Sequence, residues 1–270
     1  DGIYTRSTSS GAQYERPTSV EYLHPDGSDG FQIDAGIRIQ GGAFRGHGLT
    51  KKHSFRLLFK SEYGAGNLDY PLFGSEAAQQ FDSLTLRMES NDGWQGAAAG
   101  GQPQYARDEF HRRTQRAMGQ PSPHGTYAHL YINGIYWGLY NVAERPDDSF
   151  GESYYGAERD SWDGFNAAFD RGNVINADGD RERQDRAVTA WTTMAGLARD
   201  VRQARTEPDR TAALMKLAGK LPDGTDDPSQ ETFLDLENYI DYLILNQWGG
   251  NTDWPRKNFY VGRENSPDSD

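Results

Sequence analysis

The sequence predicts an α+β protein of two lobes, with a strand-rich part at residues 1–146 and a helical part at residues 147–270. Three observations predict this organisation. Alternating apolar and polar residues recur through the first part, apolar residues at helical spacing recur through the second, and Pro146 stands where the pattern changes. A chain of 270 residues is long enough for two lobes.

The composition is that of a folded protein without a nucleic-acid-binding face. Aromatic residues make up 12% of the chain, too many for a disordered segment. The net charge of −12 argues against a nucleic-acid partner, which would require a basic surface. No apolar run approaches the roughly 18 residues of a membrane span. Because the chain has no cysteine, thiol catalysis, disulfide bonds and cysteine-based zinc sites are excluded.

Strands alternate with turns in the first part of the chain. The alternation of apolar residues predicts strands at 19–23, 33–40, 52–60 and 81–88. A glycine-rich connection, residues 41–48, leads into the strand that carries Lys52. This order gives a strand, a glycine-rich turn and a strand with a lysine at its start.

A helix and a hairpin complete the first part. Residues 107–118 predict a helix, with Asp108 and Glu109 in its first turn and Gly119 after its end. Asn133-Gly134 between two apolar runs is a strong signal for a β-hairpin. Its second strand leads to Glu144 and then to Pro146.

Helical patterns dominate the second part. Helices are expected at residues 185–205, 210–220 and 233–248, the last with an apolar stripe that includes Ile240 and Ile244. Residues 251–258 follow as a loop, and a strand is expected at 259–261.

This order of parts is that of a protein-kinase fold, in which each part has a task. A strand lysine neutralises nucleotide phosphates, and a helix carboxylate holds that lysine in place. In the loop, an Asp accepts the proton of the substrate hydroxyl and an Asn five residues later binds magnesium. Lys52, Asp108, Asp253 and Asn258 occupy these positions. Structural interpretations stay open. Lys52 is also typical of an exposed edge strand and Asp108 of a helix N-terminus. Asp253 could cap a turn, and Asn258 could close a loop.

Several motifs in combination resemble the spore-coat protein H (CotH) kinase family, an atypical kinase-like family, over nearly the whole chain. The motifs are Gly36-Ile37-Arg38-Ile39-Gln40-Gly41-Gly42, Lys52-His53-Ser54-Phe55-Arg56, Arg107-Asp108-Glu109-Phe110, Leu130-Tyr131-Ile132-Asn133-Gly134-Ile135-Tyr136-Trp137-Gly138-Leu139-Tyr140 with Glu144, and Asn251-Thr252-Asp253-Trp254 with Asn258. The resemblance implies transfer of phosphate from ATP, with Mg²⁺ or Mn²⁺, to serine or threonine of a protein substrate. It also implies a bacterial protein at the cell envelope or outside the cell, and a longer multidomain chain.

The resemblance also implies roles for single residues. Lys52 resembles the phosphate-binding lysine, Glu144 the acid that closes the hairpin at the nucleotide, Asp253 the catalytic Asp and Asn258 the metal-binding Asn. The sequence departs from the family pattern in two places. Ala43 and Phe44 stand where the family usually has small hydroxyl residues. The family's Trp-Asp-x-(Asp/Glu) metal motif does not follow the last strand, so a C-terminally truncated domain is expected.

A rival interpretation is a non-catalytic module. Tryptophan and tyrosine are abundant, and Trp94, Trp137 and Trp254 could line a carbohydrate-binding face of an extracellular adhesion module. A kinase-like scaffold with only a structural role is a second rival. A kinase requires that Lys52, Asp253 and Asn258 converge on one site, whereas a sugar-binding sheet does not.

Overall fold

The computed structural model describes residues 2–93, 103–168, 171–175, 181–252, 254–255 and 257–265. The chain divides into two compact units. The first unit comprises Asp1–Arg113 and Ser122–Arg145, and the second comprises Thr114–Pro121 and Pro146–Asp270. The change of unit after Arg145 lies beside the boundary expected at 146, but the segment Thr114–Pro121 was expected in the first part. Each unit is described by itself below.

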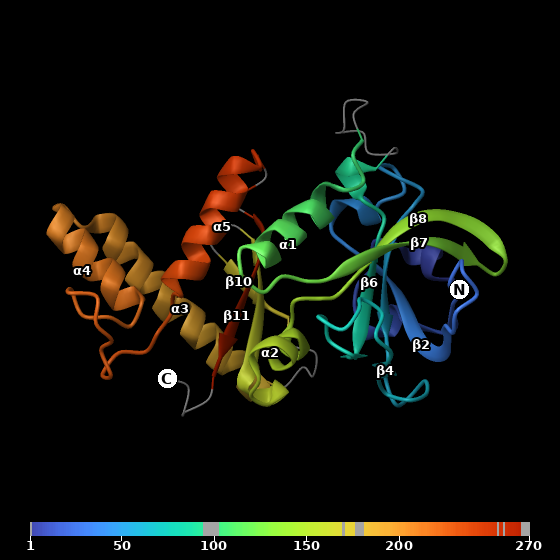
Figure 1. Ribbon diagram of the computed structural model, residues 1–270, viewed down its shortest axis with the longest axis horizontal. Coiled ribbons are helices and arrows are strands. Elements are labelled where there is room, and N and C mark those ends of the chain that lie inside the picture. Colours follow the sequence, from blue (N-terminus) through green and yellow to red (C-terminus); the bar gives the residue numbers. More distant parts are fainter. Residues whose placement is uncertain are drawn as a thin grey trace. The chain divides into compact units, whose positions relative to one another are not determined.

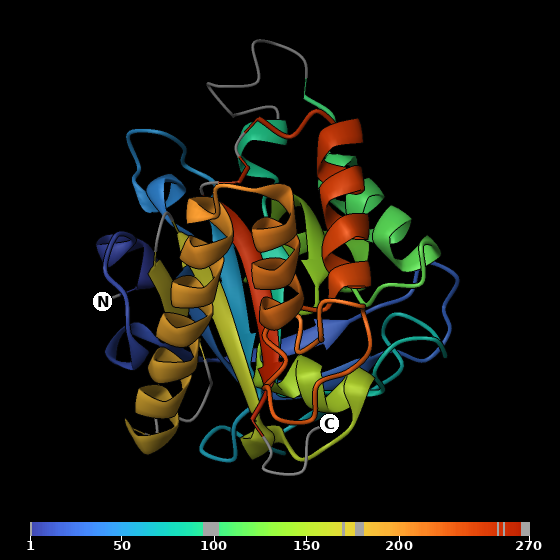
Figure 2. The same ribbon diagram turned by 90° about the vertical axis from the view of Figure 1, so that its left-hand side faces the viewer.

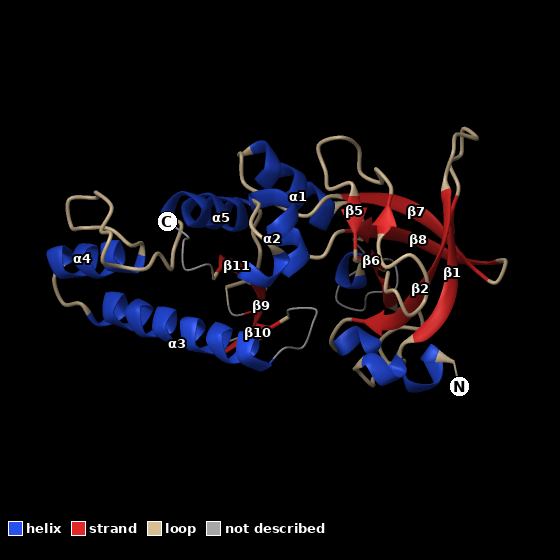
Figure 3. Ribbon diagram, turned by 90° about the horizontal axis from the view of Figure 1, so that it is seen from below, coloured by secondary structure: helices blue, strands red, loops and turns tan. Residues whose placement is uncertain are grey.

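The first unit is built on a six-stranded antiparallel sheet in the order β1-β2-β3-β6-β8-β7. The sheet curls strongly, as the red strands in Figure 3 show. A two-stranded ribbon, β4 with β5, is separate from it. The strands are β1 (Arg16–Tyr22), β2 (Phe31–Gln40), β3 (Ser54–Leu58), β4 (Leu68–Asp69), β5 (Gln80–Phe81), β6 (Ser83–Arg87), β7 (Gly125–Ile132) and β8 (Ile135–Ala143).

Cross-strand apolar pairs form the core of this unit. Phe55 of β3 lies opposite Leu86 of β6, and Leu86 in turn lies opposite Val142 of β8. Such pairs on neighbouring strands contribute directly to sheet stability. The central strands are therefore buried by apolar residues that the alternation in the sequence had indicated. Other buried members of this core are Ala35, Ile39, Leu57, Phe59, Leu68, Phe81, Leu84, Met88 and Tyr140.

The predicted hairpin is present as β7 and β8, drawn in light green in Figure 1. Its turn has positive φ at both central residues, 51° at Asn133 and 78° at Gly134. Asn and Gly adopt this left-handed conformation most readily, and it matches the twist of the flanking strands.

Helix α1 (Arg107–Ala117) begins in the first unit and ends in the second. Glu109 in its first turn is buried and forms ion pairs of 2.8 Å with Arg112 and with Arg113. After the helix, Gln120 donates a hydrogen bond of 2.8 Å to Asp241 and accepts one of 2.8 Å from Asn238. These bonds explain why Thr114–Pro121 belongs to the second unit.

The second unit combines helices with a small sheet, whereas a helical part was expected. Strands β10, β9 and β11 form an antiparallel sheet in that order, and α3 and α4 lie side by side, in orange in Figure 2. The elements are α2 (Asp148–Tyr155), β9 (Trp162–Ala168), β10 (Arg171–Val174), α3 (Arg181–Gln203), α4 (Glu207–Leu217), α5 (Leu236–Trp248) and β11 (Lys257–Glu264). Within the described residues, no helix has both the length and the hydrophobicity of a membrane span.

An ionic network joins α2, β9 and α3 in this unit. The Arg183 side chain donates to the carbonyl oxygen of Trp162 at 2.7 Å and to the Asp148 carboxylate at 3.3 Å. A further ion pair of 3.3 Å connects Arg159 to the same carboxylate. Asp148 is fully buried and Arg183 is only 4% exposed, so the charges compensate each other inside the unit.

Helix α5 begins three residues later than expected because Asp235 caps it. The Asp235 side chain accepts a hydrogen bond of 3.0 Å from the backbone N–H of Asn238. The expected apolar stripe is only partly correct, since Ile240 and Ile244 are exposed whereas Leu245 is buried. The helix carries apolar residues on several sides, and packing of one side leaves another uncovered.

Candidate functional site

Lys52 is a fixed, partly buried cation two residues before β3, which begins at Ser54 and not at residue 52 as expected. Its Nζ donates a hydrogen bond of 2.6 Å to the backbone oxygen of Leu139 and lies 4.3 Å from the ring centroid of Tyr140 and 5.6 Å from that of Tyr105. Burial lowers the pKa of Lys52, and the negative charge of Glu89 partly opposes this. The ammonium group has further N–H donors with which it could bind an anion.

Gly138 of β8 leaves room for this lysine. Its φ is +121°, and a Cβ atom at this position would lie 3.3 Å from Cε of Lys52. The strand pairing shifts register between Leu130 and Tyr131, opposite this glycine. A glycine therefore permits both the bulge in the hairpin and the close approach of the Lys52 side chain.

Asp108 lies in α1 as predicted, but its partner is Arg87 and not Lys52. The ion pair between Arg87 and Asp108 measures 2.6 Å. Burial raises the pKa of Asp108, but the charges of Arg87, Arg112 and His111 outweigh that effect and lower it overall. The expected Lys52–Asp108 pair is wrong in this structure, because β6 presents a guanidinium group to the start of the helix. Its proposed part in cofactor binding stays a prediction.

Glu89, which follows β6, is an acidic residue that the sequence did not single out. It is 5% exposed, has left-handed backbone angles (φ 61°, ψ 29°), and its Oε1 atom is enclosed without a hydrogen-bond partner in the described structure. Burial raises the pKa of Glu89 to about 7, although Arg87 and Arg112 oppose the shift. No motif marks this position. Only the pairing of β6 with its neighbours reveals it.

The raised pKa of Glu89 predicts a pH-dependent stability. The folded protein binds the proton more tightly than the unfolded chain, whose Glu pKa is near 4.5. The favourable contribution is therefore complete below about pH 4.5 and is lost as the pH rises through about 7. Since Gln cannot ionise, we expect Glu89→Gln to unfold with a higher free energy than the wild type at pH 8.5, by up to about 3 kcal/mol.

Urea denaturation at pH 4.5 and at pH 8.5 measures this difference. At pH 4.5 the advantage of Glu89→Gln should be small. The control Glu62→Gln, at an exposed position, should differ from the wild type by no more than about 0.5 kcal/mol at either pH. An equal effect of Glu89→Gln at both pH values would contradict the assignment.

Glu144 joins the end of β8 to the segment that precedes β7. Its Oε2 atom accepts hydrogen bonds from the backbone N–H of His124 at 2.6 Å and from His124 Nδ1 at 3.2 Å. The Glu144 backbone N–H donates in return to the His124 oxygen at 3.0 Å. Buried in this way, Glu144 closes the hairpin; its predicted contact with a cofactor stays a prediction.

Two histidines fix the glycine-rich segment before β3. Nδ1 of the buried His53 lies 2.9 Å from the Phe44 oxygen, and its Nε2 lies 3.0 Å from Nδ1 of His47. Nε2 of His47 lies 2.9 Å from the Tyr4 oxygen. Carbonyl oxygens can only accept, so a neutral His53 donates from Nδ1 to the Phe44 oxygen, and its Nε2 can accept. Burial lowers the pKa of His53, which agrees with its neutral form.

The predicted catalytic loop is described only in part. Asp253 lies outside the described residues. Asn258 is exposed, has a φ of 65°, and is the extra residue where the pairing of β11 with β9 shifts register between Lys257 and Phe259. Asparagine tolerates this left-handed conformation better than most residues. The metal-binding role of Asn258 stays a prediction.

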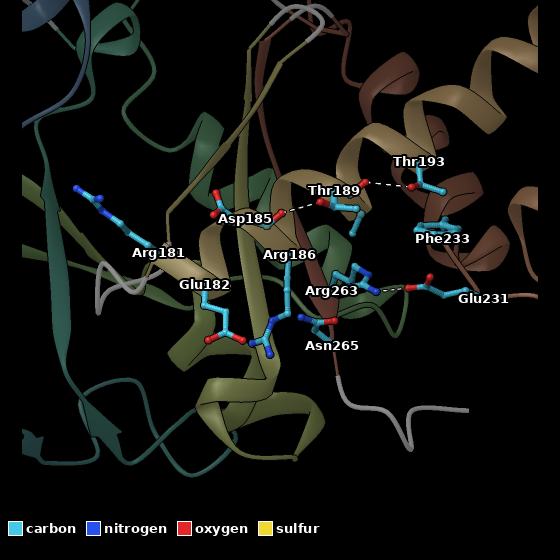
Figure 4. Close-up of a pocket in the computed structure, with 11 residues that line it drawn as sticks. Arg181, Glu182, Asp185, Arg186, Thr189, Thr193, Glu231, Phe233, Arg263 and Asn265 are labelled. Carbon is cyan, nitrogen blue, oxygen red and sulfur yellow. Dashed lines mark hydrogen bonds and ion pairs between the residues drawn. The ribbon is translucent and has the colours of Figure 1, made fainter.

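A hollow of about 670 Å³ lies in the second unit, between α3, residues 231–233 and the end of β11. Figure 4 shows Arg263 directed at Glu231 within it, whereas Arg181 points away from the other side chains. Its wall carries both acidic and basic side chains, and none of the predicted site residues lines it. Its charges give no preference for a phosphate ligand.

Candidate metal ligands are few. Among the residues that the structure describes, no group of three His, Asp or Glu side chains is placed to hold a metal ion. The six histidines of the chain show no paired metal-ligand spacing in the sequence. Asn258 was the one metal ligand that the sequence predicted, and it lies within the described residues.

Comparisons with known proteins bear on this site. The model of a family described as CotH kinase protein matches residues 37–269 of the chain. The match includes all five residues that the sequence had indicated for binding, catalysis or metal coordination. A comparison with curated proteins gave no match.

Proposed function

Because the chain belongs to the CotH kinase protein family, we propose that it transfers the γ-phosphate of ATP to serine or threonine hydroxyls of a protein substrate. The proposal includes a two-lobed kinase-like arrangement of its two units. The environment of Lys52 carries the proposal, because a partly buried ammonium fixed just before a strand, close to a glycine-rich segment, suits a nucleotide phosphate.

Each predicted site residue has a separate role in the proposed reaction. Lys52 binds and neutralises phosphate oxygens, and Asp253 accepts the proton of the attacking hydroxyl. Asn258 offers an amide oxygen to a metal ion. Mg²⁺ or Mn²⁺, when bound with ATP, neutralises charge on the phosphates. Lys52 fits the phosphate part of the ligand, since its remaining N–H groups are available to an anion.

Replacement of Lys52 by alanine tests this function. A charge-assisted hydrogen bond contributes about 1.5–3 kcal/mol, so we expect Lys52→Ala to weaken ATP binding by about 10- to 100-fold. The matched control is Lys51→Ala, which removes the exposed lysine next to it and should leave the affinity unchanged. Isothermal titration of Mg-ATP into the three proteins measures the effect. Equal affinities in all three would contradict the proposed role of Lys52.

The glycan-binding alternative has less support from the aromatic residues. The Trp137 indole N–H donates a hydrogen bond of 2.9 Å to the hydroxyl of Tyr4, and the Trp137 side chain packs against the core of the first unit. Trp254 is partly buried and packs edge-on against Tyr242, with ring centroids 5.8 Å apart. Trp94 lies outside the described residues. Trp137 and Trp254 are both partly buried, which leaves less ring surface for a sugar to stack on. Binding to a glycan array without any ATP binding would favour the alternative.

A further inference from the structure

The strand pairing of the first unit brings Lys52 and Glu89 to the same end of the sheet. In the antiparallel register of β3 with β6, Phe55 lies opposite Leu86. Continued by three residues beyond the pairing, this register brings position 52 opposite position 89. The backbone N–H of Met88 donates a hydrogen bond of 3.0 Å to Ser54 Oγ, which connects the two segments of the chain here.

The neighbouring strand completes this arrangement. In the register of β6 with β8, Arg87 lies opposite Asn141, and the same continuation brings position 89 opposite position 139. β6 lies between β3 and β8 in the sheet, and Lys52 Nζ donates a hydrogen bond of 2.6 Å to the Leu139 oxygen. The lysine, which precedes β3, therefore reaches the backbone of β8 at the end of the sheet where Glu89 follows β6.

Both groups have unused hydrogen-bonding capacity. Glu89 Oε1 is enclosed and has no hydrogen-bond partner in the described structure. The Lys52 ammonium has three N–H groups, of which one is used on Leu139. No hydrogen bond or ion pair among the described contacts joins Lys52 to Glu89. A buried acceptor without a donor is costly, and a lysine on a flexible four-carbon chain at the same end of the sheet can supply one.

We propose that Glu89, and not an acidic residue of helix α1, is the positioning carboxylate of Lys52. The ionised Glu89 carboxylate stabilises the charged form of Lys52 and orients its ammonium group. The neutral carboxyl group does not have this effect. Binding of a phosphate by the ammonium in this position rests on the proposed function. The pairing of Lys52 with Glu89 does not depend on that function.

The charged groups around Glu89 make the interaction between Glu89 and Lys52 sensitive to pH. Arg87 and Arg112 favour the ionised form of its carboxyl group, whereas Asp92 and Asp108 oppose it. Burial is the main cause of the raised pKa of Tyr127, and the negative charge of Glu89 raises it further. Because burial raises the pKa of Glu89 to about 7, both of its forms are populated near neutral pH.

Competitive acylation of lysine amines, read by mass spectrometry, tests the pairing without nucleotide. The labelling of Lys52 is measured between pH 6 and 10 against that of the exposed Lys51 as internal reference. Loss of the Glu89 charge lowers the pKa of Lys52, so Glu89→Gln should raise the Lys52/Lys51 labelling ratio about threefold or more at pH 8–9. Glu89→Asp should restore most of the wild-type ratio. Asp108→Asn should leave the ratio unchanged at pH 8–9, where Glu89 is already ionised and Arg87 holds the Asp108 carboxylate.

The wild-type protein gives an independent measurement. As Glu89 ionises, the Lys52/Lys51 ratio should fall by about threefold between pH 6 and pH 8. An unchanged ratio in Glu89→Gln, a flat wild-type ratio, or a larger effect of Asp108→Asn would overturn the proposal. Protection of Lys52 by Mg-ATP tests the proposed function separately. If the Glu89 effect appears and ATP gives no protection, the pairing stands and the nucleotide role fails.

Discussion

Replacement of Asp253 by asparagine is expected to lower the rate of phosphotransfer by about 10²- to 10⁴-fold, the usual range for loss of a general base. Asparagine keeps the size of the side chain but cannot accept the proton of the substrate hydroxyl. ATP affinity should change little, because Lys52 remains. Initial rates with labelled ATP, together with ATP titrations, separate the two effects.

Asp235→Asn is the matched control for this substitution. Asp235 caps α5 through the backbone N–H of Asn238, and asparagine caps helices as well as aspartate does. The control should therefore retain both its rate and its stability. If Asp253→Asn behaves like Asp235→Asn, Asp253 is a turn residue and has no part in catalysis.

The largest effect on stability is expected at Arg183. Its replacement by alanine leaves the buried Asp148 carboxylate with one ion-pair partner fewer and removes the donor to the Trp162 oxygen. Removal of one partner of a buried ion pair costs about 3–5 kcal/mol. We expect a loss of this size in the free energy of unfolding, measured by urea denaturation.

Arg210→Ala is the control for this loss. Arg210 pairs with Glu207 on the surface of α4, where both side chains are largely exposed. Such pairs contribute about 0–1 kcal/mol, so the control should lose little. A loss below about 1 kcal/mol for Arg183→Ala would mean that the network is not important for the second unit.

Local signals in the sequence predicted most of the elements correctly. The Asn133-Gly134 turn identified the hairpin because the left-handed backbone of this turn requires such residues. The acidic first turn and the terminal glycine identified α1 within one residue. These features depend on neighbours in the chain, and a single sequence contains them in full.

Features that depend on distant pairing were missed. Strand β9 contains Asp163, Gly164 and Asn166, which have low strand propensity, and it forms through its pairing with β11 about 95 residues later. The side-chain partners in the site were missed for the same reason. Asp108 was chosen as the partner of Lys52 from the order of the elements along the chain. In the structure, Arg87 at the end of β6 forms the ion pair with Asp108.

Glu89 shows this limit most clearly. As a sequence position it is one of 40 acidic residues, without a motif around it. Its burial, its backbone conformation and its raised pKa all result from the place where β6 ends. A carboxyl group of this kind can be found only once the strands are paired.

The proposed phosphotransfer can be tested by following the two ends of ATP. The protein is incubated with Mg²⁺ or Mn²⁺, a serine- and threonine-containing protein, and ATP labelled either at the γ- or at the α-phosphate. We expect label on serine or threonine from the γ-position alone, and we expect this label to be lost in Lys52→Ala. Label from the α-position, or equal labelling by wild type and Lys52→Ala, would show that the chain does not transfer the γ-phosphate as proposed.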